Sequence, residues 1–219
     1  MFSQVKVVGR GRVGTAVHAR LAQSGLAADG PDADLVLLCV PDSVIAGAAS
    51  AIPVGAWIAH VSGATPLSAL APHERRFGLH PLQTFTLARG PEQLDGAWAA
   101  VTGETDAARE RGHWLADCLG LRPFDIEDES RVLYHAGAAM ASNFLVTLYR
   151  AASRLLESAG APPEALLPLM RRTIDNGFDL TGPIARGDWT TVDAHLAAIH
   201  RTAPDLKALY RAMAQVTRP

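Results

Sequence analysis

Short apolar runs and longer mixed segments alternate along the first half of the chain. Residues 35–40 are continuously apolar and lie between Asp34 and Pro41, a pattern typical of a strand that is buried on both faces of a sheet. Similar runs predict further strands over residues 5–8, 57–61, 77–79, 98–101 and 122–126. Mixed segments predict the main helices, over residues 13–23, 42–51 and 105–119. This alternation indicates an α/β fold with a doubly wound, parallel sheet.

The pattern changes at the acidic segment 127–130. From Arg131 onward no segment predicts a strand, and helices are expected over residues 131–158, 162–176, 190–199 and 205–216. Acidic residues before a helix favour its N-terminus through the helix dipole. We therefore expect a sheet domain over residues 1–126 and an all-α domain over residues 127–219. The first of these helices is apolar on all sides, so it is predicted to be buried.

A glycine-rich turn lies between the first predicted strand and the first predicted helix. Its sequence is Gly9-Arg10-Gly11-Arg12-Val13-Gly14. In Rossmann-like folds the first glycine of such a turn makes it tight, the second admits a pyrophosphate and the third lets the helix pack closely. The helix N-terminus and both arginines favour an anion. These six residues are candidate ligands of NADP or NAD in a Rossmann-like domain; the alternative is a tight turn that binds no nucleotide.

The connection between the first helix and the strand that starts at Leu35 is short. Residues 25–34 cannot hold the second strand, the second helix and the turns of a complete dinucleotide fold. Residues 26–28 predict at most a short strand ending at Asp29, which is either a ribose ligand or part of a plain turn. The second strand and helix are therefore expected to be abbreviated. A non-catalytic protein, or one that binds a mononucleotide or phosphate, is the alternative function.

Candidate catalytic residues lie on the predicted strand end and on the long helix. His80 follows a short strand, at the edge where ligands of doubly wound sheets bind. At 100° per residue, Ser142 lies two turns above His135, with Asn143 on the adjacent flank. We predict His135 as the acid/base, Ser142 and Asn143 as groups that orient the substrate, and His80 as a second acid/base candidate. The alternative is a hydrogen-bonded network within the helix packing.

Together these segments resemble the DUF2520 family, two-domain proteins of the 6-phosphogluconate dehydrogenase-like superfamily. The resemblance is carried by the glycine turn and by the segments 40–42, 62–64, 80–85, 134–135, 141–143 and 181–188. It implies an NAD(P)-dependent oxidoreductase that reduces a small carbonyl or imine substrate and forms a homodimer through its helical domain. Val40, Pro41 and Ser62 would border the nicotinamide. The lysine of related hydroxyacid dehydrogenases is replaced by Ala139, so a histidine would have to donate the proton.

Composition narrows the possible partners. The net charge of −2 gives no electrostatic reason to expect a nucleic acid or an anionic membrane as a partner. The chain shows neither a signal peptide nor an apolar stretch of membrane-spanning length, which favours a cytoplasmic location. Its two cysteines, Cys39 and Cys118, are too few for a zinc site, and both are predicted to be small buried residues without a metal.

Overall fold

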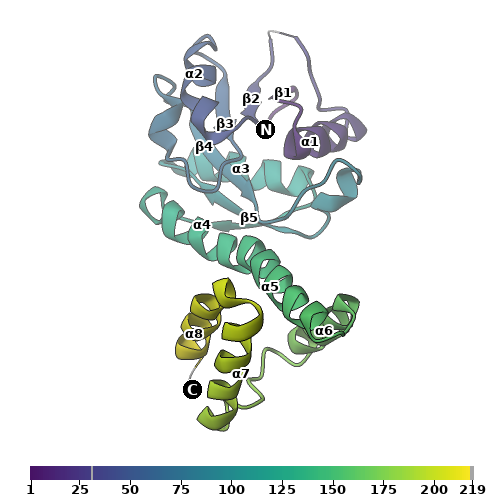
Figure 1. Ribbon diagram of the computed structural model, residues 1–219. Coiled ribbons are helices and arrows are strands. Elements are labelled where there is room, and N and C mark those ends of the chain that lie inside the picture. Colours follow the sequence, from purple (N-terminus) through teal and green to yellow (C-terminus); the bar gives the residue numbers. More distant parts are fainter. Residues whose placement is uncertain (31, 218–219) are drawn as a thin grey trace. The chain divides into compact units, whose positions relative to one another are not determined.

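The computed structural model describes residues 1–30 and 32–217 (Figure 1). Packing divides the chain into two compact units, residues 1–140 and 141–219. The first unit contains the whole sheet and also the first turns of the long helix, α4 (Arg131–Ala139). The predicted boundary between residues 126 and 127 separates the strands from the later helices. That these two parts are separate domains stays a prediction. The two units are described one at a time.

The sheet of the first unit has six strands whose order in space follows their order in the chain. They are β1 (Val5–Val8), β2 (Leu35–Leu38), β3 (Trp57–His60), β4 (Arg76–Pro81), β5 (Trp98–Thr102) and β6 (Arg122–Asp125). All neighbours are parallel except β4 and β5, which are antiparallel. The predicted doubly wound, parallel sheet is confirmed, and this antiparallel pairing is its one departure among the described strands. Parallel strands are usually joined through an α-helix, and the connection from β4 to β5 has only the 3₁₀ turn Pro91–Leu94.

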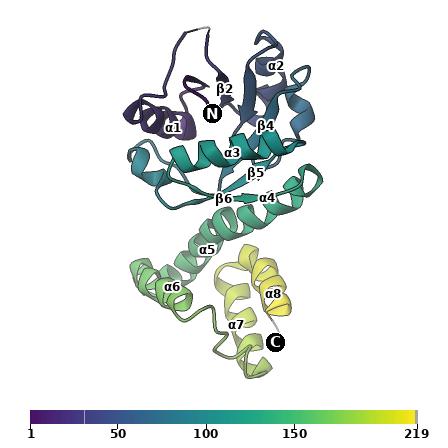
Figure 2. The same ribbon diagram turned by 180° about the vertical axis from the view of Figure 1, so that it is seen from behind.

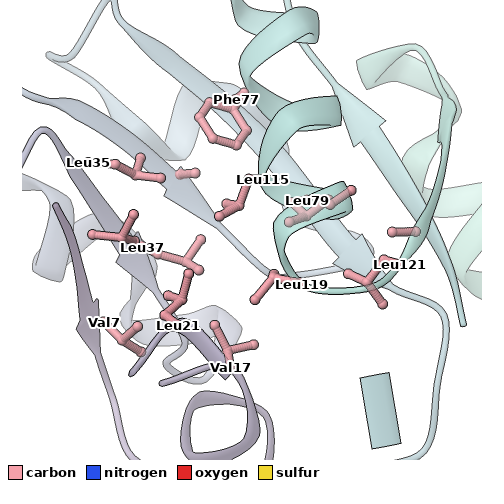
Figure 3. Packing of buried hydrophobic residues seen from close by; sticks show 14 of the residues in the cluster. Val7, Val17, Leu21, Leu35, Leu37, Phe77, Leu79, Leu115, Leu119 and Leu121 are labelled. Atoms are coloured by element: carbon pink, nitrogen blue, oxygen red, sulfur yellow. The ribbon is translucent and has the colours of Figure 1, made fainter. Parts of the chain in front are cut away.

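Helices cover both faces of the sheet, as expected for a doubly wound fold (Figures 1 and 2). α1 (Arg12–Gln23) and α3 (Asp106–Cys118) pack on one face, and α2 (Ile45–Ser50) packs on the other. Successive side chains of β2 pack alternately on the two faces of the sheet. Leu35 and Leu37 belong to the cluster under α1 and α3 (Figure 3), and Val36 and Leu38 belong to the cluster under α2. The prediction that this apolar run is buried on both faces is confirmed.

The second strand of a complete dinucleotide fold is reduced to a single bridge on the outer edge of β1. Ala27 pairs with Val5 there. The Val5 amide donates to the Leu26 carbonyl at 2.8 Å, and the Ala28 amide donates to the Val5 carbonyl at 3.0 Å. No helix follows this bridge in the described part of residues 24–34. The abbreviated second strand and helix are thus confirmed.

The remaining helices follow the sequence pattern closely. After a π-helical turn, Met140–Phe144, come α5 (Leu145–Ser158), α6 (Leu166–Asp175), α7 (Trp189–Thr202) and α8 (Lys207–Val216). Gly160, with a φ of +75°, ends the long helix, and Asp188 caps α7 by accepting from the Thr191 amide at 3.0 Å. The all-α second half is therefore confirmed. No helix within residues 1–30 and 32–217 has the length and apolarity that crossing a bilayer requires.

The prediction that the long helix is buried is wrong for the single chain. Leu133 is 80% exposed and Phe144 is 56% exposed, although both are large and apolar. Apolar composition on all sides predicts burial only where other elements cover every side of a helix. Within the single chain, other elements leave large parts of this helix uncovered.

Candidate functional site

The carboxyl ends of four parallel strands lie at one edge of the sheet. Val8, Leu38, His60 and Gly78 are neighbours in the register of β1 to β4. The segments that follow these positions are the glycine turn, Val40 with Pro41, Ser62 with Gly63, and His80. Ligands of doubly wound folds bind at this edge. The fold therefore brings most of the predicted site residues of the first unit to one place.

Two glycines of the turn are required by packing, and the third is open. Gly9 has a φ of +98°, and a Cβ atom on it would overlap the Cys39 carbonyl. A Cβ atom on Gly14 would overlap the Gly9 carbonyl and lie 3.0 Å from the Cys39 Cβ. Gly11, in contrast, has nothing within 4 Å of its Cβ position. Gly11 is thus the position at which another molecule can approach the backbone.

The start of α1 offers a favourable place for an anion. Its N-cap is Gly11, no side chain caps the helix, and its first turn has no acidic residue. Backbone N–H groups and the positive end of the helix dipole are therefore free of a competing carboxylate. Arg12 is exposed at the same place, and Arg10 forms an ion pair of 3.3 Å with Asp29. Asp29 lies just after the remnant of the second strand.

Ser62 shapes the loop after β3. Its hydroxyl oxygen accepts from the amides of Ala64 at 3.2 Å and Thr65 at 3.0 Å, and it donates to the Thr65 hydroxyl at 2.9 Å. Because the side chain is buried and used within the turn, its contribution to the edge is to fix the backbone. The residue that this turn presents is Gly63.

Two histidines converge on Gly63, and a tyrosine contacts one of them. Nδ1 of His80 lies 2.8 Å from the Tyr134 hydroxyl, and the ring centroids of His80 and His135 are 5.8 Å apart. A Cβ atom on Gly63 would lie 3.0 Å from Nε2 of His80 and would overlap Cδ2 of His135. The structure therefore brings the predicted residues His80 and His135 together, from β4 and α4.

A buried guanidinium connects the loop after β3, β5 and α4 through hydrogen bonds. Arg131, the first residue of α4, is 1% exposed, and it is the only Arg, Lys, Asp or Glu side chain in the described part of the chain that is buried. It donates to the carbonyls of Ser62 and Thr65 and to the Thr102 hydroxyl. The nearest acid is Asp128, 3.9 Å from Nε. Asp128 itself accepts from the Leu67 amide through both oxygens, at 3.0 and 3.1 Å.

Burial and the Arg131 charge determine the protonation of the cluster. Burial lowers the pKa of His80 to about 4, and the charges of His135 and Arg131 act in the same direction. Burial raises the pKa of Tyr134 to about 12, while Arg131 acts in the opposite direction. At neutral pH His80 is therefore an uncharged imidazole and Tyr134 a protonated phenol.

His60 lies at the same strand ends as this cluster, but its side chain is buried in the interior. It is fully buried, and neither ring nitrogen has a hydrogen-bond partner. Burial lowers its pKa to about 4, and Arg131 adds to the effect. This histidine is a neutral part of the interior beside Arg131 rather than a group available to a ligand.

Ser142 and Asn143, the other two predicted catalytic residues, lie in the second unit. Both are in the π-helical turn Met140–Phe144, where the Ser142 hydroxyl donates to Oδ1 of Asn143 at 3.3 Å. The uninterrupted α-helical spacing that predicted a stripe from His135 to Ser142 does not hold through this turn. π-helical turns inside α-helices are frequent at functional sites. The roles of the two residues stay predictions.

Sequence reasoning missed two members of the cluster. Tyr134 stood out only as the neighbour of His135, because its contact with His80 spans 54 positions along the chain. Arg131 carried a weak signal, since a cation at the first position of a helix opposes the helix dipole. A cation at this position therefore indicates that other groups of the protein bind its side chain.

The cysteines and potential metal ligands add no further group to the edge. Cys39 is buried under the glycine turn, where burial raises its pKa to about 12, and Cys118 is partly exposed; both are free thiols. Among residues 1–30 and 32–217, no three His, Cys, Asp or Glu side chains are grouped closely enough to hold a metal ion.

Comparison with protein families identifies the chain. The sequence profile of the Domain of unknown function DUF2520 matches residues 97–217, more than half of the chain. The chain belongs to the DUF2520 family. The matched region of this DUF2520 protein begins before β5 and includes Arg131, Tyr134, His135 and the π-helical turn. No curated protein matches the chain.

Solved structures share the fold over almost the whole chain. A Bacteroides fragilis protein, named as a candidate NADP oxidoreductase, superposes with a TM-score of 0.81 at 20% identity, over 98% of this chain and 97% of that one. A Thermotoga maritima protein gives 0.78 at 23% identity, over 97% and 96%. A reductive aminase from Aspergillus terreus, solved with NADPH and ethyl levulinate, gives 0.68 at 16% identity, over 100% and 95%. The DUF2520 chain thus has the Rossmann-like fold with a helical second half.

Proposed function

We propose that this DUF2520 protein is an NADP- or NAD-dependent oxidoreductase that reduces a small carbonyl or imine substrate. The observation that carries the proposal is the common sheet edge. There an open glycine turn follows β1, and His80 near the end of β4 meets Tyr134 and His135 of α4. The likeness in fold to a reductive aminase and an imine reductase that were solved with reduced cofactors supports it.

The residues of the glycine turn fit a pyrophosphate. Gly11 leaves its Cβ position open, the α1 N-terminus is uncapped, and Arg10 and Arg12 are exposed cations beside it. Val13 is the next residue of the same first helical turn. Val40, Pro41 and the Ser62–Gly63 turn follow the adjacent strands and would border the nicotinamide. A bound nicotinamide cofactor would supply the hydride.

The cluster at Gly63 would supply the proton. His80 and His135 are the candidate acid/base groups, and both reach the edge at which the reacting carbon would lie. Ser142 and Asn143 would orient the substrate oxygen or nitrogen. Histidine side chains can donate and accept protons by themselves, so they can carry out acid–base chemistry of this kind.

Cofactor titration tests the proposal. We expect purified protein to bind NADPH or NADH, detected by calorimetry and by nicotinamide fluorescence. Gly11→Glu places a carboxylate at the open position and should abolish this binding without unfolding the protein. Gly47→Glu is the matched control, because Gly47 in α2 is also exposed and has nothing within 4 Å of its Cβ position. The absence of any signal with either cofactor at millimolar concentration would reject the proposal.

A second candidate function follows from the reduced second strand. The outer edge of β1 carries only the Ala27 bridge, and Arg10 pairs with Asp29 where an adenosine ribose would be held. A protein of this kind would bind a mononucleotide or phosphate without catalysis. Thermal stabilisation by AMP or inorganic phosphate, together with none by NADPH or NADH, would favour this candidate over the oxidoreductase.

We also infer that the protein forms a homodimer through its helical half. The described part of the second unit exposes many large apolar residues in the single chain. Among them are Phe144, Leu145, Val146, Leu148, Leu167, Leu169, Ile174, Phe178 and Leu180. Monomeric proteins rarely expose large contiguous apolar patches.

A further inference from the structure

The contact between His80 and Tyr134 involves one of the two ring nitrogens of His80. Nδ1 lies 2.8 Å from the Tyr134 hydroxyl. In a neutral imidazole one nitrogen accepts a hydrogen bond and the other carries hydrogen, and a phenol O–H group is a good donor. When the hydroxyl donates to Nδ1, the proton of His80 is on Nε2. The ring then offers an N–H group on the side away from Tyr134.

That second nitrogen lies beside Gly63. A Cβ atom on Gly63 would lie 3.0 Å from both Cε1 and Nε2 of His80 and would overlap Cδ2 of His135. His80 therefore presents the Cε1–Nε2 edge of its ring toward Gly63. A donor at Nε2 is placed to reach a carbonyl oxygen or an imine nitrogen at the sheet edge.

The charges around His80 favour a neutral ring. Tyr134, His135 and Arg131 face it from α4, and Asp42 faces it from the turn after β2. Arg131 has the same charge as an imidazolium, so its burial beneath the edge disfavours protonation of His80. The same charge favours a negative oxygen on Tyr134. Asp42 acts against the effect on His80 but is exposed to solvent.

We propose that, given the proposed function, Tyr134 and Arg131 are positioning residues that make neutral His80 the proton donor, through its Nε2–H group, to a carbonyl or imine substrate. In this step the Nε2–H bond breaks as an O–H or N–H bond forms on the substrate. The O–H bond of Tyr134 breaks as a bond from hydrogen to Nδ1 forms. The charge left on the Tyr134 oxygen is stabilised by Arg131 and removed by a proton from water. The two electrons arrive with the hydride from NADPH or NADH.

Nuclear magnetic resonance tests the tautomer without any cofactor. The protein labelled with ¹⁵N in its histidine rings should show, for His80, the pattern of a neutral ring protonated at Nε2 between pH 8 and pH 5. The His80→Gln variant assigns the signal. Tyr134→Phe should shift the Nδ1 resonance and give a mixture of tautomers. A ring of His80 protonated at Nδ1, or unchanged nitrogen shifts in Tyr134→Phe, would overturn the proposal.

The charge of Arg131 is tested through the titration of His80. Arg131→Lys keeps the charge and should keep the low midpoint, whereas Arg131→Gln should move the midpoint toward pH 6.5. If Arg131→Gln does not fold, the comparison of wild type with Arg131→Lys and Tyr134→Phe still decides the tautomer. A wild-type His80 that titrates near pH 6.5 would overturn the role of Arg131.

Turnover provides the link to catalysis. With NADPH and a panel of small aldehydes and cyclic imines, Tyr134→Phe should lower kcat about 100-fold, with little change in the affinity for NADPH. His135→Gln should lower kcat less than His80→Gln. The reverse order would assign the proton to His135 and reject the proposal while leaving the oxidoreductase function intact. If neither the wild type nor any variant binds a cofactor, the proposed function is rejected. The ¹⁵N spectra would still show which ring nitrogen of His80 carries the proton.

Discussion

His60 and His80 lie near the carboxyl ends of neighbouring strands, and each has a pKa lowered to about 4. Burial is the main cause for both, and the charge of Arg131 adds to it. A histidine in the unfolded chain has a pKa of about 6.5, so between pH 6.5 and pH 4 the unfolded state binds more protons than the folded state. The free energy of unfolding contributed by these residues is thus fully present above pH 6.5 and is lost as the pH falls toward 4.

Acid should therefore destabilise the protein partly through His60. A shift from 6.5 to about 4 corresponds to about 3 kcal/mol for a fully buried histidine. Urea unfolding at pH 7.5 and pH 4.5 measures the effect, and the His60→Leu variant should lose a large part of the difference. Carboxylates titrate in the same range, so the comparison between wild type and variant isolates His60. An equal pH dependence in both proteins would contradict this assignment.

Gly63 is required because two rings occupy the space beside it. Gly63→Ala would place a methyl group onto Cδ2 of His135 and against His80, so both rings would have to move. We expect reduction of small aldehydes and cyclic imines to fall about 100-fold, while NADPH affinity in calorimetry is retained. Gly137→Ala is the control on α4, since nothing lies within 4 Å of that Cβ position. Wild-type turnover in Gly63→Ala would show that the positions of the two rings do not limit the reaction.

At the scale of elements, different glycines of the turn are expected to determine protein stability and cofactor binding. Gly9→Ala combines a positive φ with overlap at the Cys39 carbonyl, so it should cost at least about 2 kcal/mol of unfolding free energy. Gly11→Ala meets open space and should leave stability within about 0.5 kcal/mol of wild type while weakening cofactor binding. Urea denaturation and calorimetry distinguish the two. Equal losses of stability would mean that the turn is a purely structural unit.

Elements that depend on local pattern were predictable, and elements that depend on distant partners were not. The apolar run predicted over residues 35–40 contains β2, Leu35–Leu38, because burial on both faces leaves no polar position in the strand. The direction of β5 depends on how its connection folds back, which apolar runs do not encode. The π-helical turn Met140–Phe144 has a composition ordinary for an α-helix. Gly9, Gly11 and Gly14 were correctly placed, since their spacing is itself the signal.

The candidate site divides in the same way. His80 was predicted just after a strand and lies within β4, close to its carboxyl end, because β4 is longer than its apolar core. His135 was predictable because it lies on the long helix. Their contact was not, since it depends on the α4 helix being anchored at Arg131, whose partners are backbone carbonyls and a hydroxyl from loops and strands. Carbonyl oxygens carry no sequence signal. A buried cation held by them is visible only in a folded structure.

At the scale of the whole molecule, the exposed apolar residues of the second unit predict a homodimer. Leu145 and Leu148 lie one turn apart on α5, and Leu169 on α6 is 62% exposed. Leu169→Arg places a charge among these residues and should shift the mass measured by light scattering from two chains toward one.

The matched control for the dimer is Leu87→Arg, because Leu87 is also exposed, at 67%, but lies between β4 and β5 in the first unit. It should keep the wild-type mass at every concentration. If the helical half is the interface, sedimentation equilibrium should show a weaker dimer for Leu169→Arg with circular dichroism unchanged. A wild-type protein that sediments as a single chain at micromolar concentration would reject the homodimer, and the exposed apolar residues would then need another partner.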